Sequence, residues 1–114
     1  MTTIYHNPRC SKSRASLQAL EDRGIEPTII KYLETPPSKE ELTDILEKLG
    51  MQAEQIVRKG EALYKELGLQ NNSLSNEEWI DVLVANPRLI ERPIVVNGDK
   101  AAIGRPLENV IGIL

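Results

Sequence analysis

The alternation of apolar and polar positions predicts a strand, a helix and a second strand in the first third of the chain. Residues 2–5 are β-branched or aromatic, and Pro8 soon after them cannot extend a strand ladder. Residues 11–22 suit a helix, with Gly24 as its stop signal. A further run rich in β-branched residues predicts a strand over residues 28–33. This order of elements is typical of a right-handed βαβ unit.

The middle of the chain has the pattern of a helical block over residues 38–86. Ser38 and Ser75 each precede a glutamate by three residues, which is the spacing of a capping box at a helix start. Apolar residues follow Ser38 with helical period as far as Gly50, which marks the helix end. Residues 54–67 are mixed and are expected to form one or two short helices. We therefore predict a helical insertion at 38–86 within one domain.

The last quarter of the chain predicts a hairpin followed by a helix. Residues 94–96 are apolar, and Asn97-Gly98 after them is the strongest short-range hairpin signal. Residues 100–103 would form the partner strand, and Pro106 suits the first turn of a terminal helix. The whole pattern predicts a single α/β domain over residues 1–114 with a four-stranded mixed sheet.

Composition excludes several classes of function. The 114 residues carry 14 basic and 17 acidic side chains, and a net charge of −3 argues against nucleic acid or an acidic membrane surface as partner. No apolar run approaches the roughly 20 residues that span a bilayer. One cysteine and one histidine exclude an internal disulfide and the usual zinc sites, so we predict no metal. The first residues lack the features of a secretory signal, and we expect a cytoplasmic protein.

The single cysteine, Cys10, lies where the first predicted helix begins. Unpaired N–H groups and the helix dipole favour negative charge at such a place, and this lowers a thiol pKa. Arg9, Lys12 and Arg14 surround the thiol, and the first 14 residues contain no acid. Basic side chains at a helix N-terminus oppose local stability, and such conflicts tend to mark function. The pattern indicates a pocket that stabilises an anion, first the thiolate and then an oxyanion substrate.

Each residue around the thiol also has a purely structural interpretation. Cys10 could be a small buried hydrophobe, and His6 could either lower the thiol pKa or hold the loop by a hydrogen bond. Ser13 occupies the place of the second thiol of a Cys-x-x-Cys motif, so a mixed disulfide at Cys10 would need an external thiol for its release. Ser16, six residues after the cysteine, excludes the Cys-x5-Arg loop of tyrosine phosphatases.

Three further arginines have a side chain suited to tetrahedral oxyanions. The planar guanidinium donates two parallel hydrogen bonds, which matches the geometry of such anions. Taken singly, each arginine is also compatible with a solvated surface position, and the sequence pattern does not bring the three together. They are Arg58, Arg92 and Arg105.

Four stretches of the chain, in order and with consistent spacing, resemble the arsenate reductase family that couples to glutathione and glutaredoxin. The stretches are residues 4–14, 32–38, 91–96 and 104–106. The resemblance implies a thioredoxin-like fold with a helical insertion and a cis peptide at Arg92-Pro93 facing the cysteine. It also implies that Cys10 is the nucleophile. The residues implied to bind the oxyanion are Arg58, Arg92 and Arg105, and those implied to support the thiolate are His6 and Ser13.

The same resemblance implies reduction of arsenate to arsenite, without a bound cofactor and with glutathione as co-substrate. Glutaredoxin, arsenate and arsenite are then the expected partners. Two other hypotheses stay open: a glutathione-dependent thiol reductase of another substrate, and a non-catalytic regulator that binds RNA polymerase. Ser13 in place of a second cysteine counts against the redox switch that such regulators usually carry.

Overall fold

The computed structural model describes residues 2–69, 73–104 and 106–114. Its elements group into two compact units. Met1–Thr35 and Arg92–Leu114 form the first, which we call the sheet unit, and Pro36–Glu91 form the second, which we call the helical unit.

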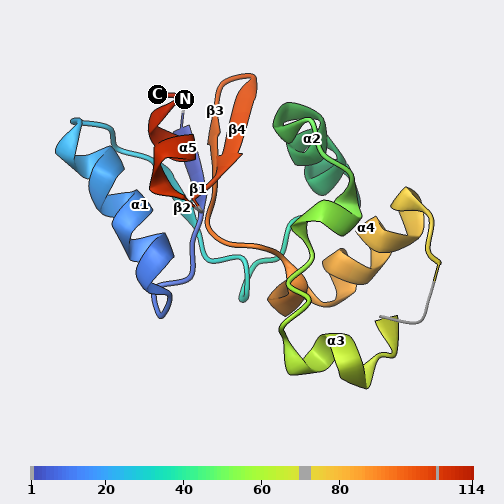
Figure 1. The fold of residues 1–114 in the computed structure, drawn as a ribbon. Coiled ribbons are helices and arrows are strands. Elements are labelled where there is room, and N and C mark those ends of the chain that lie inside the picture. The colour runs from blue at the N-terminus through green and yellow to red at the C-terminus, as the bar shows by residue number, and fades with distance from the viewer. Residues whose placement is uncertain (1, 70–72, 105) are drawn as a thin grey trace. The chain divides into compact units, whose positions relative to one another are not determined.

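The sheet unit contains a four-stranded sheet in the order β2-β1-β3-β4 and two helices, α1 and α5 (Figure 1). Strand β1 pairs with β2 in parallel and with β3 antiparallel, and β3 pairs antiparallel with β4. The predicted α/β class with a four-stranded mixed sheet is confirmed. The element bounds are β1 Thr2–Tyr5, α1 Ser11–Asp22, β2 Thr28–Ile30, β3 Ile94–Asn97, β4 Lys100–Ile103 and α5 Leu107–Ile111.

The core of the sheet unit lies between the sheet and its two helices, which contact each other. Burial of apolar side chains from β1, β3, β4, α1 and α5 holds these elements together, because it removes their surface from water. The buried cluster consists of Ile4, Leu20, Val95, Ala102 and Val110. This packing fixes the start of α1 close to the end of β1, where the cysteine lies.

The second strand is shorter than predicted. We expected it over residues 28–33, but β2 ends at Ile30. The N–H groups of Glu34 and Thr35 both donate to the carbonyl oxygen of Lys31 at 2.9 Å, so the backbone turns directly after the strand. The turn buries Tyr32, a residue that is only 2% exposed.

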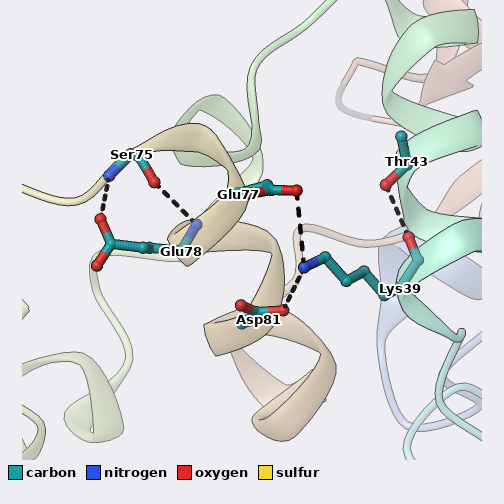
Figure 2. Close-up of polar contacts among 6 residues, drawn as sticks. All are labelled: Lys39, Thr43, Ser75, Glu77, Glu78 and Asp81. Carbon is teal, nitrogen blue, oxygen red and sulfur yellow. Dashed lines mark hydrogen bonds and ion pairs between the residues drawn. The ribbon is translucent and has the colours of Figure 1, made fainter.

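The helical unit confirms the predicted helices and both capping boxes. Ser75 Oγ accepts from the Glu78 N–H at 3.2 Å, and Glu78 Oε1 accepts from the Ser75 N–H at 3.0 Å (Figure 2). Ser38 makes the same pair of bonds with Glu41, and Gly50 ends that helix in the left-handed region with φ of 68°. The elements are α2 Lys39–Leu49, η1 Ala53–Ile56, α3 Ala62–Glu66, α4 Asn76–Ala85 and η3 Pro87–Leu89.

An ion-pair cluster joins α2 to α4 inside the helical unit. Lys39 Nζ lies 3.2 Å from Asp81 Oδ1 and 3.9 Å from Glu77 Oε1, so one ammonium bridges two carboxylates on one helix face (Figure 2). The predicted helical block at 38–86 lies within this unit, which extends to Glu91 because the Glu91 N–H donates to the Ile56 carbonyl oxygen at 2.8 Å. None of the described helices is both long and apolar enough to cross a membrane.

Candidate active site

Cys10 is the N-cap residue of α1, as the sequence predicts. Its backbone is extended, with φ of −96° and ψ of 124°, and its carbonyl oxygen accepts the first helical bond from the Arg14 N–H at 3.0 Å. Asn7 closes the preceding loop, because its carbonyl oxygen accepts from the Cys10 N–H and its side-chain Oδ1 accepts from the Arg9 N–H, each at 3.0 Å. The loop therefore places the thiol beside the free N–H groups of the first helical turn.

The surroundings of the Cys10 thiol favour its ionised form. Burial raises the pKa of the thiol, whose residue is 7% exposed. Hydrogen bonds from the Ser13 N–H, the Arg92 guanidinium and the Lys12 N–H, together with the charge of Arg92, outweigh burial and lower the pKa to about 7. About half of the thiol is then thiolate at neutral pH, and the thiolate is the nucleophilic form.

The cation beside the thiol is not one of its sequence neighbours. We expected Arg9, Lys12 and Arg14 to act through their charges, but the acting charge is that of Arg92, and Lys12 contributes its backbone N–H. Arg14 instead donates from Nη1 to the Pro8 carbonyl oxygen at 3.0 Å, because its position on the helix directs it back over the loop. The thiol does lie beside a positive charge, as expected, but that charge belongs to Arg92 and not to the neighbours of Cys10 in the sequence.

Arg92 opens the segment that leads into β3, and its peptide bond to Pro93 is cis, as the resemblance implied. Burial lowers the pKa of Arg92, but hydrogen bonds with Cys10 and Tyr32, and the charges of these two groups, raise it beyond its ordinary value. A guanidinium in this place stays charged and can hold an anion next to the sulfur. Tyr32 was missed as a site residue, since a tyrosine after a short strand carries no local sign of its distant partner.

His6 contacts Ser13, the residue whose backbone N–H bonds the thiol. The imidazole Nδ1 lies 2.7 Å from Ser13 Oγ, which also accepts from the Asn7 N–H at 3.0 Å. Burial, followed by the charges of Lys31 and Arg14, lowers the pKa of His6, so the ring is neutral at pH 7. The resemblance implied that Ser13 supports the thiolate. In the structure the Ser13 hydroxyl lies between His6 and Asn7, and it is the Ser13 N–H that lowers the pKa of the thiol.

Gly104, directly after β4, allows Pro93 and Ser16 to approach the backbone closely, which no local sequence pattern indicates. Its N–H donates to the Pro93 carbonyl oxygen at 2.9 Å. A Cβ at this position would overlap Ser16 Oγ and would lie 2.7 Å from Pro93 Cγ. Ser16 is buried on α1, and its hydroxyl has no hydrogen-bond partner within the described part of the chain. Gly104 therefore lets the proline next to Arg92 pack against the helix that begins at Cys10.

Replacing Gly104 by alanine is expected to destabilise the protein by about 1–3 kcal/mol, because the added methyl group overpacks a site that already touches Pro93. Chemical denaturation of the full chain measures this free energy. The matched control is Gly60→Ala, where a Cβ meets nothing within 4 Å, and a change within about 0.5 kcal/mol is expected there. Equal losses of stability in the two variants would contradict the close packing of Pro93 and Ser16 against Gly104.

The structure does not test the predicted roles of Arg58 and Arg105. Arg58 belongs to the helical unit, where its Nη1 pairs with Glu61 Oε2 at 2.8 Å and its N–H donates to the Leu89 carbonyl oxygen at 2.7 Å. Arg105 lies outside the described residues. The structure thus brings Cys10, His6, Ser13 and Arg92 together within the sheet unit, while the oxyanion-binding roles of Arg58 and Arg105 stay predictions. No group of three or more potential metal ligands occurs among the described residues.

The family model described as ArsC family matches residues 5–113. The chain belongs to the ArsC family. An arsenate reductase of Neisseria meningitidis serogroup A is 53% identical over 112 residues, which cover 97% of this chain and 96% of that protein. A longer arsenate reductase of Escherichia coli is 44% identical over 112 residues, covering 98% of this chain and 79% of its own length.

A solved structure supports the same membership and the fold. The putative arsenate reductase from Yersinia pestis superposes with a TM-score of 0.94 at 50% identity, over 99% of this chain and 100% of that one. The predicted family resemblance and the thioredoxin-like α/β fold of this ArsC-family chain are thereby confirmed.

Proposed function

We propose that the chain reduces arsenate to arsenite, with Cys10 as nucleophile and with glutathione and glutaredoxin as electron donors. The observation that carries this proposal is the Cys10 thiol, with its pKa lowered to about 7, held against the Arg92 guanidinium. A thiolate supplies the nucleophile, and a guanidinium suits the tetrahedral oxyanion that it attacks. The relatives named arsenate reductase support arsenate as that oxyanion.

The first step joins the substrate to the enzyme. The Cys10 thiolate attacks arsenic, a sulfur–arsenic bond forms, and one oxygen leaves as water after it has been protonated. Arg92 donates to the remaining oxygens and offsets their charge, which is greatest in the transition state. His6 and Ser13 keep the first helical turn in the geometry that stabilises the thiolate. Arg58 and Arg105 belong to this proposal as further oxyanion ligands.

The electrons come from thiols outside the chain, which contains a single cysteine. Glutathione adds to arsenic and displaces a second water. The glutaredoxin thiolate then attacks the glutathione sulfur, a disulfide forms, and the electron pair of the broken sulfur–arsenic bond reduces arsenic from the pentavalent to the trivalent state. Water hydrolyses the remaining bond, which releases arsenite and restores Cys10. A reducing compartment such as the cytoplasm would keep these thiols available.

A coupled assay tests the proposed function. The full chain is mixed with glutathione, glutaredoxin, glutathione reductase and NADPH, and NADPH oxidation is followed with and without arsenate. Oxidation that depends on arsenate is expected, and phosphate at the same concentration is expected to give none, since phosphorus is not reduced by thiols. An equal rate with and without arsenate would refute arsenate reduction. If the chain shows no response to arsenate but speeds the reduction of a small disulfide by glutathione when glutaredoxin is left out, a thiol reductase of another substrate would instead be favoured.

A further inference from the structure

A pocket of about 300 Å³ lies beside the loop that leads to Cys10, entirely within the sheet unit. Its volume is at the lower end of the range for small-molecule sites. Loop residues 6–9 contribute to its lining, and the turn after β2 contributes Lys31, Leu33 and Glu34. Because Arg9 of this lining directly precedes Cys10 in the chain, a ligand held here lies beside the loop that ends at Cys10.

The charged groups of this pocket are free to meet a ligand. Arg9, Lys31 and Glu34 are all exposed, and none of them forms an ion pair within residues 2–69, 73–104 and 106–114. The charge of Lys31 reaches His6, another lining residue, and helps to lower the pKa of that ring. The pocket thus presents two cations, one carboxylate and a neutral imidazole.

The lining does not suit a simple oxyanion. Glu34 would repel a small anion such as arsenate, and the side chain of Leu33, in a residue that is 42% exposed, offers it only apolar surface. A ligand with two carboxylates, one ammonium group and a short aliphatic stretch matches all four side chains. The two cations would pair with the carboxylates, Glu34 would pair with the ammonium, and Leu33 would cover the aliphatic part.

Building on the function proposed above, we propose that this pocket binds the small thiol co-substrate through its charged ends, and that this thiol is a peptide with two carboxylates and one free ammonium. Glutathione has this set of groups, with its thiol between the two carboxylates. Binding here holds the thiol of the co-substrate beside the loop that ends at Cys10, the residue on which the arsenic adduct forms. Arg9 and Lys31 act on the co-substrate and not on the ionisation of Cys10, to which neither contributes.

The test uses a reaction of Cys10 that does not involve arsenate. The Cys10 thiolate attacks glutathione disulfide, a mixed disulfide forms, and one glutathione thiolate leaves. The rate constant, followed by the mass of the intact full chain, is compared with that for 2-hydroxyethyl disulfide, which has no charge. The ratio of the two rate constants reports charge recognition, and the uncharged disulfide reports whether the thiol is intact in each variant.

Arg9→Ala and Lys31→Ala are each expected to lower this ratio about two- to fivefold, and the double variant about tenfold, which are the values of exposed charge pairs. Added salt should lower the ratio of the wild-type chain toward that of the double variant. Lys100→Ala is the matched control, since it removes the same charge from an exposed position of β4 that does not line the pocket. Its ratio is expected to equal that of the wild type.

The outcomes separate this inference from the proposed function. A double variant with the wild-type ratio would overturn the pocket assignment, even if the coupled assay shows arsenate reduction. A lowered ratio in a chain that does not reduce arsenate would uphold the pocket and refute arsenate as the substrate.

Discussion

Replacing Cys10 by serine is expected to abolish arsenate-dependent NADPH oxidation in the coupled assay, with a loss of at least about 10³-fold. A serine hydroxyl is not ionised at neutral pH, so the hydrogen bonds from the first turn of α1 and from Arg92 no longer have an anion to stabilise. The chain has no second cysteine that could take over. The loss should therefore appear at every concentration of arsenate and glutathione.

The fold of this variant serves as its control. Serine differs from cysteine by one atom, and the residue is 7% exposed at the N-cap, a position that serine favours. The denaturation midpoint of Cys10→Ser is expected to match or exceed that of the wild type. Turnover within tenfold of the wild type would show that Cys10 is not the nucleophile.

The second large effect is expected for Arg92→Ala. This change removes both a hydrogen bond and a positive charge from the Cys10 sulfur, so the pKa of the thiol should rise from about 7 toward its ordinary value. It also removes a donor to the oxyanion, which costs roughly 10²–10³-fold in turnover at comparable sites. Arg92→Lys keeps the charge without the planar fork and should give an intermediate rate.

The rate of thiol reaction is expected to increase with pH. Thiolate is present above the thiol pKa and is lost as the pH falls through about 7, so the wild-type rate of thiol reaction should rise up to that pH and then level off. In Arg92→Ala the levelling should move to higher pH. Lys100→Ala is the matched control: it removes a positive charge from an exposed position of β4 that does not contribute to the thiol pKa, so its profile should match the wild type. Equal shifts in both variants would contradict the role given to Arg92.

The elements that the sequence predicts well are those with local signals. The capping boxes at Ser38 and Ser75 and the hairpin at Asn97-Gly98 depend on residues a few positions apart, and all three form as expected. The placement of Cys10 at a helix start is local in the same way. The end of β2 was predicted too late, because Tyr32 and Leu33 also suit a strand, whereas the backbone turns at Lys31.

The parts of the site that could not be predicted depend on packing between distant segments. Arg92 reaches the thiol because β3 pairs with β1, and local patterns indicated only the bases next to Cys10. Gly104 matters only because β4 returns to the helix that carries Ser16. For Arg92 the family resemblance gave the correct partner where charge patterning did not. For Arg58 it gave a role that is still to be tested, in a side chain paired with Glu61.

The central claim is that the fold turns the lone thiol into an ionised nucleophile at neutral pH. The most direct test is the rate of alkylation of Cys10 by iodoacetamide as a function of pH, measured on the full chain. Since the chain has one cysteine, the rate reports this thiol alone. The structure predicts a midpoint at about pH 7. A midpoint at or above about 8.5, the value of a free cysteine, would contradict it.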